Sequence, residues 1–260
     1  MYDDICRFLA EHFSSDFASW LMGESITMTE IKPSELFLDP IRADALILLQ
    51  SDELILHLEF QTLPKKNVPF RLLDYRVRVY RKYPDKPMRQ VVIYLKETSS
   101  DLVQQTSFTM ERTRHEFDVI RLWEQPASVF LQYPGLVPFA VLGQSADSQA
   151  TLRQVAEIVD QVSDSTAQAN LIAASGILAG LKLEQEVIYQ ILRRDIMQES
   201  VIYQSIQREG EAKGAARKQR EIATNLLRDG FPIEAVARGT GLSIEEVQEL
   251  QRQINESAQG

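Results

Sequence analysis

The sequence predicts an α/β protein in which a mixed sheet flanked by helices is followed by an all-helical C-terminal region. Two apolar runs around a short polar turn, at residues 43–49 and 53–61, are typical of a β-hairpin. A helical pattern at 70–83 and a buried-strand pattern at 91–95 follow, which is the order of an α/β fold. From residue 151 onward the apolar residues recur with helical spacing. The sheet is therefore expected before residue 143.

Length and composition are those of a globular protein. The chain has 260 residues, enough for one large domain with a helical appendage, and 25% of its residues are charged. It has no apolar run of about 18 residues and no leader-like opening, so we expect a cytoplasmic protein without membrane contact. A single Cys6 and three scattered histidines do not suit zinc. Any bound metal is therefore expected on oxygen ligands.

Two helices and a strand are predicted before the hairpin. Residues 3–13 have the apolar spacing of a helix, and a second short helix is expected to end at Gly23. Residues 25–37 alternate loosely between apolar and polar side chains. They are expected to supply the first strand of the sheet, interrupted by Pro33.

The hairpin is predicted to place two carboxylates opposite each other. If its turn is centred between Ser51 and Asp52, then Asp44 and Glu59 are cross-strand partners. Side chains alternate between the faces of a strand, so the opposite face is wholly apolar and is expected to be buried. The face of Asp44 and Glu59 also carries Leu46, Leu48, Ile55, His57 and Gln61. The apolar face carries Ala45, Ile47, Leu49, Leu54, Leu56, Leu58 and Phe60.

Facing carboxylates at Asp44 and Glu59 indicate a metal site. They repel each other unless a cation lies between them. Oxygen ligands suit Mg²⁺ or Mn²⁺, and Mg²⁺ commonly takes one or two protein carboxylates and completes its shell with water and substrate phosphate. The pair therefore indicates a phosphodiester-cleaving site. The alternative is that both carboxylates lie at strand ends and meet solvent.

A family resemblance adds to this interpretation. Asp44, followed after the hairpin by Glu59-Phe60-Gln61, is similar to the signature of the PD-(D/E)XK nucleases, which implies a restriction-endonuclease-like core. More narrowly, the chain resembles the bacterial family of recombination-promoting nucleases and transposase-like proteins. The matching stretches are Ala43-Asp44, residues 57–62, Pro69-Phe70-Arg71 and Tyr75, and the resemblance covers residues 1–143.

The resemblance implies a set of site residues. Asp44 and Glu59 would hold Mg²⁺, and Gln61 stands where the wider superfamily has Lys. Gln61 would orient the attacking water or a phosphate oxygen, although it brings no charge. Asp3 matches an acidic residue of the family's opening helix and is a further candidate. Its alternative role is that of an ordinary acidic residue at a helix start.

A basic segment follows the hairpin. The net charge is −9, yet residues 64–90 hold nine basic and two acidic side chains. Next to paired carboxylates, such a segment suits binding of a phosphate backbone. The buried stripe of its helix is expected to consist of Phe70, Leu73, Val77 and Tyr80. The predicted nucleic-acid contacts are Arg71, Tyr75 and Arg78, with Arg71 on the scissile or a neighbouring phosphate. The alternative is a solvated helix face for the arginines and a packing position for Tyr75.

The rest of the chain divides into further predicted segments. Residues 91–95 are expected as a strand parallel to its neighbour and 119–123 as an edge strand. A polar stretch at 143–150 is the predicted boundary. The resulting parts are a nuclease-like domain at 1–143, a helical subdomain at 151–206, and a charged linker with a helix-turn-helix-like tail at 207–260.

The tail has its own helical plan. One helix is expected to end at Gly230, a second to span 233–237, and a third to begin at Ser243, whose spacing to Glu246 is that of a capping box. This pattern resembles a helix-turn-helix, but the third helix begins with acidic residues, which disfavours DNA reading. Contact with other proteins, or self-association through the C-terminal helices, is the favoured role.

The sequence thus predicts a Mg²⁺- or Mn²⁺-dependent DNA endonuclease, and the resemblance implies a role in DNA recombination or mobile elements. Two alternatives stay open. The first is a nuclease-like module that binds DNA without cutting it, which Gln61 in place of Lys favours. The second is a scaffold or regulatory protein that acts through its helical tail.

Overall fold

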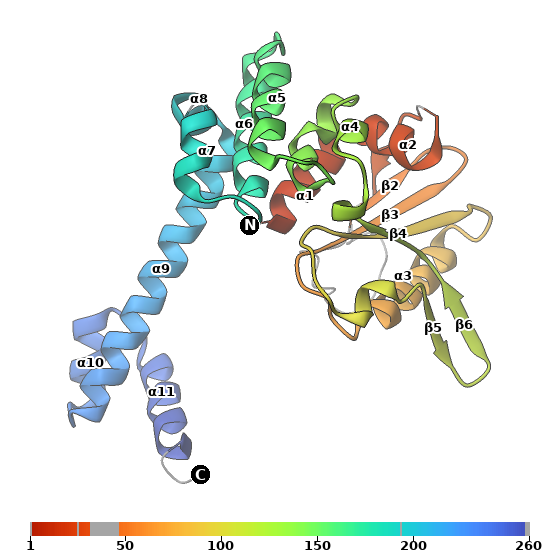
Figure 1. The fold of residues 1–260 in the computed structure, drawn as a ribbon. Coiled ribbons are helices and arrows are strands. Elements are labelled where there is room, and N and C mark those ends of the chain that lie inside the picture. Colours follow the sequence, from red (N-terminus) through yellow and green to blue (C-terminus); the bar gives the residue numbers. More distant parts are fainter. Residues whose placement is uncertain (1, 25, 32–46, 193, 258–260) are drawn as a thin grey trace. The chain divides into compact units, whose positions relative to one another are not determined.

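The computed structural model describes residues 2–24, 26–31, 47–192 and 194–257 (Figure 1). The chain divides into two compact units, Met1–Tyr203 and Gln204–Gly260. The first unit holds the sheet and the candidate site, and the second is helical.

A mixed five-stranded sheet organises the described part of the first unit. Its strands are β1 (Thr29–Glu30), β2 (Ile47–Gln50), β3 (Ile55–Gln61), β4 (Met88–Tyr94) and β7 (Asp118–Arg121). Their order in the sheet is β1-β2-β3-β4-β7. The first three pair antiparallel, whereas β4 is parallel to β3 and to the edge strand β7. The predicted α/β class, the parallel strand after the crossover and the later edge strand are confirmed.

The hairpin of β2 and β3 is confirmed, but its turn lies one residue later than predicted. Ile47 faces Leu58, and the Ser51 N–H donates to the Leu54 carbonyl at 3.0 Å, so the turn is centred between residues 52 and 53. The Leu54 N–H also donates to the Ser51 hydroxyl at 3.2 Å, which stabilises this turn. The change moves the cross-strand partners by two residues and therefore keeps the described side chains on their predicted faces. Asp44, the predicted partner of Glu59, lies outside the described residues.

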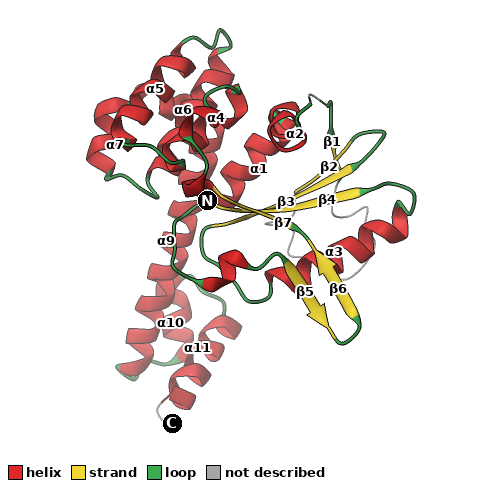
Figure 2. Cartoon of the chain, turned by 45° about the vertical axis from the view of Figure 1, so that its right-hand side comes forward, coloured by secondary structure: helices red, strands yellow, loops and turns green. Residues whose placement is uncertain are grey.

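The apolar face of the hairpin packs against N-terminal helices and a later 3₁₀ segment. Helices α1 (Tyr2–His12) and α2 (Ser14–Met22) lie on this side of the sheet (Figure 2), and α2 ends as predicted at Gly23, whose φ of 81° suits glycine. Phe60 stacks on Phe139 of η5 (Pro134–Leu142) with ring centroids 5.8 Å apart and meets Phe17 edge-on. Ile47, Leu49, Leu56 and Leu58 on the same face are buried as predicted, whereas Leu54 beside the turn is only half-buried.

Helix α3 (Val68–Lys82) covers the other face of the sheet, but it buries a different stripe than predicted. The buried side chains include Val68, Leu72, Tyr75 and Val79. Phe70, Val77 and Tyr80 are instead 51%, 42% and 58% exposed, so their predicted burial is wrong. The helix carries two apolar stripes of similar spacing, and spacing alone does not choose between them. Packing against the sheet selects the buried stripe, because Leu72 joins a core cluster with Val92 of β4 and Tyr75 joins one with Ile55 of β3.

A second, two-stranded sheet lies beside α3 and was not predicted. Strands β5 (Ser107–Met110) and β6 (Thr113–Glu116) follow η3 (Asp101–Gln104) and form an antiparallel hairpin. Phe108 of this hairpin meets Phe70 of α3 edge-on, with ring centroids 5.5 Å apart. Phe70 therefore packs against this hairpin and not in the core beneath α3.

The helical region after the sheet begins as predicted. Short elements η4 (Leu122–Glu124) and α4 (Ala127–Phe130) precede η5, and four helices follow it: α5 (Ser148–Asp160), α6 (Ser165–Ala179), α7 (Gln185–Ile191) and α8 (Arg194–Glu199). The side chains of Asp147 and Asp164 accept backbone N–H bonds at the starts of α5 and α6. Both helices pack on η5, and the compact unit continues to Tyr203.

The described part of the second unit is helical, and its first helix begins at the end of the first unit. Helix α9 (Val201–Arg228) includes the segment predicted as a partly helical linker, and α10 (Ile233–Thr240) and α11 (Ile244–Ser257) follow. Their shared core consists of Ala223, Leu227, Val236, Ala237 and Val247. The predicted capping box is confirmed: the Ser243 N–H donates to Glu246 at 2.9 Å, and the Glu246 N–H donates to the Ser243 hydroxyl at 3.2 Å. No helix of the described ranges is long and apolar enough to cross a membrane.

The orientation of α3 can be tested with two valines of the same helix. Val79 is 1% exposed and Val77 is 42% exposed. Val79→Ala removes two buried carbons and is expected to lower the free energy of unfolding by about 2 kcal/mol. Val77→Ala, the matched control, is expected to change it by less than about 0.5 kcal/mol. Urea unfolding of both variants measures the difference, and equal losses would contradict the observed stripe.

Candidate functional site

The candidate site is built on Glu59, near the C-terminal end of the central strand β3. Its neighbours β2 and β4 flank it in the sheet and α3 covers it, so Glu59 is only 1% exposed. His57 and Gln61 lie on the same face and are buried as well. An ionised carboxylate this deep is costly unless other groups compensate its charge.

Two side chains compensate the charge of Glu59 through one of its oxygens. Gln61 donates from Nε2 to Oε1 at 2.7 Å, and the Arg71 guanidinium donates to the same oxygen. Arg71 comes from the first turn of α3, just after the connection from β3. Its side chain is 28% exposed, so it links the buried carboxylate to the surface.

Burial raises the pKa of Glu59 to about 7, although Arg71 and the Gln61 hydrogen bond lower it. Asp3 raises this pKa further and Lys65 lowers it, both through charge alone. Glu59 therefore exchanges its proton near neutral pH, a property that is common among groups at functional sites.

The second oxygen of Glu59 faces a neutral histidine. Glu59 Oε2 lies 3.9 Å from His57 Nε2. Burial, and to a smaller extent the charges of Arg71 and His115, lower the pKa of His57 to about 3. His57 Nε2 has no hydrogen-bond partner among the described residues. This nitrogen is thus a buried polar atom beside the carboxylate.

The sequence-predicted site residues that the structure describes take different positions. Glu59, Gln61 and Arg71 are in direct contact. Asp3 is exposed on α1 and acts on Glu59 through its charge.

Two of the predicted nucleic-acid contacts take other positions. Tyr75 is 7% exposed and packs edge-on against His57, with ring centroids 5.4 Å apart, so its side chain lies beneath the surface. Arg78 donates from Nε to Asp74 at 2.9 Å, and its side chain is only 18% exposed. Arg71 is thus the predicted contact that joins Glu59 to the surface.

Sequence reasoning missed three residues that the structure adds to the site: His57, Gln90 and Lys65. His57 was placed on the Glu59 face by strand alternation, but no role was assigned to it. Gln90 is a polar residue directly before an apolar run, and only the strand register shows that it is the direct partner of His57. Lys65 was counted within the basic segment, and its charge acts on both Glu59 and Asp3.

The described residues offer few oxygen ligands for a cation. They contain no group of three or more His, Cys, Asp or Glu side chains placed for a metal ion. Glu59 offers one carboxylate, and Gln61, whose Nε2 faces Glu59, has a carbonyl oxygen left for another contact. Mg²⁺ commonly takes only one or two protein carboxylates. The second carboxylate expected here, from Asp44, lies outside the described residues.

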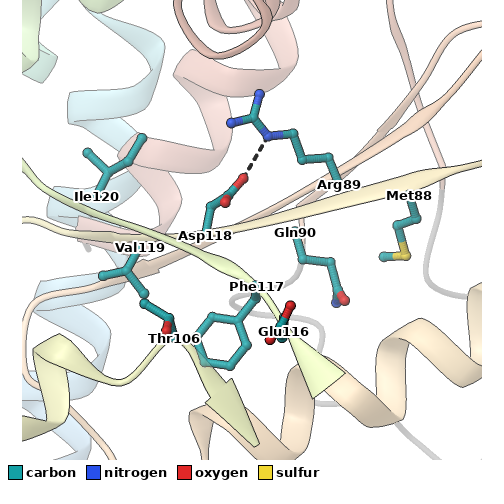
Figure 3. Close-up of a pocket in the computed structure, with 9 residues that line it drawn as sticks. All are labelled: Met88, Arg89, Gln90, Thr106, Glu116, Phe117, Asp118, Val119 and Ile120. Atoms are coloured by element: carbon teal, nitrogen blue, oxygen red, sulfur yellow. Dashed lines mark hydrogen bonds and ion pairs between the residues drawn. The ribbon is translucent and has the colours of Figure 1, made fainter. Parts of the chain in front are cut away.

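An open groove of about 700 Å³ lies at another place in the first unit, at the N-terminal ends of β4 and β7 (Figure 3). Arg89 and Asp118 form an ion pair there, with Nε and Oδ2 2.7 Å apart. Gln90 lines this groove, but neither Glu59 nor Arg71 does. Burial and charge, rather than the size of a cavity, therefore place the candidate site at Glu59.

Comparison of the chain with protein-family models, with curated proteins and with solved structures finds no match. The chemistry of the site must therefore be inferred from its own groups. These are a buried carboxylate that titrates near neutrality, an arginine and an amide bound to it, and a basic helix above it.

The pKa of Glu59 predicts how stability depends on pH. Because this pKa rises from 4.5 to about 7 on folding, the folded chain holds the proton more tightly, and stability falls as pH rises through this window. His57 acts in the opposite sense, since its lowered pKa costs stability below its usual value of 6.5. Glu59→Gln removes the first effect only.

We expect the free energy of unfolding of the wild type, measured relative to Glu59→Gln, to fall by on the order of 3 kcal/mol between about pH 4.5 and 7.5. Urea unfolding in EDTA at several pH values measures this difference. A difference that does not change with pH would show that Glu59 keeps its usual pKa.

Proposed function

We propose that the chain is a metal-dependent DNA endonuclease of the PD-(D/E)XK type, with Glu59 and Asp44 as ligands of Mg²⁺ or Mn²⁺. The observation that carries the proposal is the contact of the buried Glu59 carboxylate with both Gln61 and Arg71. A titratable group that is shifted by burial and held by a specific charge partner is typical of a functional site. A role in DNA recombination or mobile elements follows from the resemblance alone.

The fold supports the proposal through the order of its elements. An antiparallel hairpin carries Glu59 and Gln61, helix α3 crosses over them, and β4 returns parallel to β3. This arrangement agrees with the restriction-endonuclease-like core that the resemblance implies. It presents both site residues on the face that α3 covers.

Each residue has a chemical role in the proposed reaction. A bound Mg²⁺ ion would supply charge stabilisation for phosphodiester hydrolysis. Glu59 and Asp44 would hold it, and the carbonyl oxygen of Gln61 would orient the attacking water. The partly exposed guanidinium of Arg71 suits a phosphate oxygen, because Arg forms paired hydrogen bonds with phosphate.

Basic side chains before α3 and at its end suit a DNA backbone. Lys65 and Lys66 are exposed on the connection before α3, and Arg81 and Lys82 are exposed at the end of the helix. Positive charge near a buried carboxylate would draw phosphates toward an otherwise acidic protein. DNA is therefore the proposed partner.

One observation favours a second candidate, a DNA-binding module that does not cleave. Gln61 carries no charge, and its amide is used in the hydrogen bond to Glu59. A Lys at this position would supply an ammonium group to the reaction, which Gln61 does not. The two candidates differ in cleavage but share DNA binding.

Removal of the Glu59 charge tests for catalysis. Glu59→Gln keeps the size and polarity of the side chain, and we expect it to abolish Mg²⁺-dependent nicking of plasmid DNA while the far-ultraviolet circular dichroism spectrum is retained. The physical reason is the loss of a metal-binding carboxylate. EDTA should stop cleavage by the wild type.

A matched control lies in the same hairpin. Glu53 is an exposed turn residue, and Glu53→Gln should cleave at the wild-type rate. Unchanged cleavage by Glu59→Gln would contradict the site assignment. Absence of cleavage in every variant, with DNA binding retained, would favour the non-cleaving module.

The salt dependence of binding tests the arginines. In a Glu59→Gln background, where loss of Arg71 leaves no buried charge, Arg71→Ala with Arg78→Ala should weaken DNA binding at any sequence. The slope of log affinity against log salt should become shallower by roughly one to two units, at about 0.9 per phosphate contact. Fluorescence anisotropy measures the slope, and Arg153→Ala on α5 is the control, because Arg153 is exposed and belongs to another element. An unchanged slope would assign both arginines to a solvated face.

A further inference from the structure

The parallel pairing of β3 and β4 brings two buried polar side chains together behind Glu59. His57 and Gln90 are direct partners in the strand register. Their exposed fractions are 0% and 5%, so neither can rely on solvent for its hydrogen bonds. The hydrogen bond between these two side chains therefore constrains which of their nitrogen atoms carry hydrogen.

The Gln90 amide group is fixed by a backbone carbonyl. Its Nε2 lies 2.8 Å from the carbonyl oxygen of Leu72 in α3, which only accepts hydrogen bonds. The amide NH₂ group must therefore face Leu72. The same Nε2 lies 2.9 Å from Nδ1 of His57, so the second amide hydrogen points at the imidazole.

This contact sets the tautomer of His57. Nδ1 faces a donor at hydrogen-bond distance and must accept, so it carries no hydrogen. A doubly protonated ring would place two donors against each other and is excluded on the same ground. The ring hydrogen is therefore on Nε2, the atom that lies 3.9 Å from Glu59 Oε2 and has no other hydrogen-bond partner among the described residues.

We infer that His57 is a positioning residue whose Nε2–H, fixed by Gln90, holds the second oxygen of Glu59. Tyr75 packs edge-on against the ring and limits its rotation. A movement of about 1 Å closes the gap to a normal hydrogen bond.

The role of this donor rests on the proposed function. When Arg71 binds a phosphate and no longer donates to Glu59 Oε1, the His57 Nε2–H remains as a donor to the carboxylate. It keeps the carboxylate turned toward the metal.

The tautomer is tested directly in the full-length chain by ¹⁵N nuclear magnetic resonance of the histidine rings. The chain has three histidines, and the signal absent from His57→Gln identifies the ring of His57. We expect a protonated Nε2 and an unprotonated Nδ1 at neutral pH in the absence of metal. A protonated Nδ1 would overturn the inference.

Metal affinity tests the positioning role with a readout other than cleavage. His57→Gln can place an amide N–H where the ring had Nε2–H, whereas His57→Leu fills similar space without a donor. By isothermal titration with Mg²⁺, we expect His57→Leu to bind roughly 10-fold more weakly and His57→Gln to bind within about threefold of wild type, as for other residues that orient a metal ligand.

His12→Leu is the control, because His12 bonds the Phe8 carbonyl on α1 and makes no contact with Glu59. Urea unfolding shows whether each variant is folded. Equal Mg²⁺ affinity of His57→Leu and wild type would overturn the inference. The expected tautomer in a chain that binds no Mg²⁺ would instead refute the proposed function and support the hydrogen-bond geometry of Gln90, His57 and Glu59.

Discussion

The burial of one carboxylate constrains much of the first unit. Glu59 is central in the sheet and covered by α3, so its charge must be balanced by groups that the fold itself delivers. Arg71 can balance the charge of Glu59 only because α3 begins within a few residues of the end of β3. Gln61 can donate a hydrogen bond to Glu59 because alternate residues of one strand share a face. Leaving such a charge without partners would cost several kcal/mol, a large part of the stability of a typical domain.

The fold was largely predictable from the sequence because its strong patterns are local. Short apolar runs, the glycine after α2 and the Ser243 capping box each depend on neighbouring residues only. Two features were not predicted correctly. The turn of the first hairpin depends on how Ser51 bonds Leu54, and the buried stripe of α3 depends on which side chains fit β3 and β4. Hydrophobic spacing is compatible with either stripe, so it could not give the answer.

The site was predictable where strand alternation determines which side chains share a face. Alternation placed Glu59, Gln61 and His57 on one face, and the position of the basic segment together with the family resemblance indicated Arg71. Gln90 could not be found in this way, because its neighbourhood with His57 requires the exact pairing of two strands separated by a helix. Tyr75 shares a stripe with buried residues of α3, which explains why it lies inside and not among the surface arginines.

The hydrogen bond between His57 and Gln90 also bears on how the strands align during folding. Strands rich in Val, Ile and Leu can slide past one another at little cost, since one apolar contact resembles the next. A slip of one residue would put His57 opposite Arg89 or Val91 and would separate it from the Gln90 amide. Each buried polar group left without a partner costs roughly 1–3 kcal/mol. Misaligned sheets are thereby penalised, and the polar residues beneath α3 help to select a single pairing of the strands.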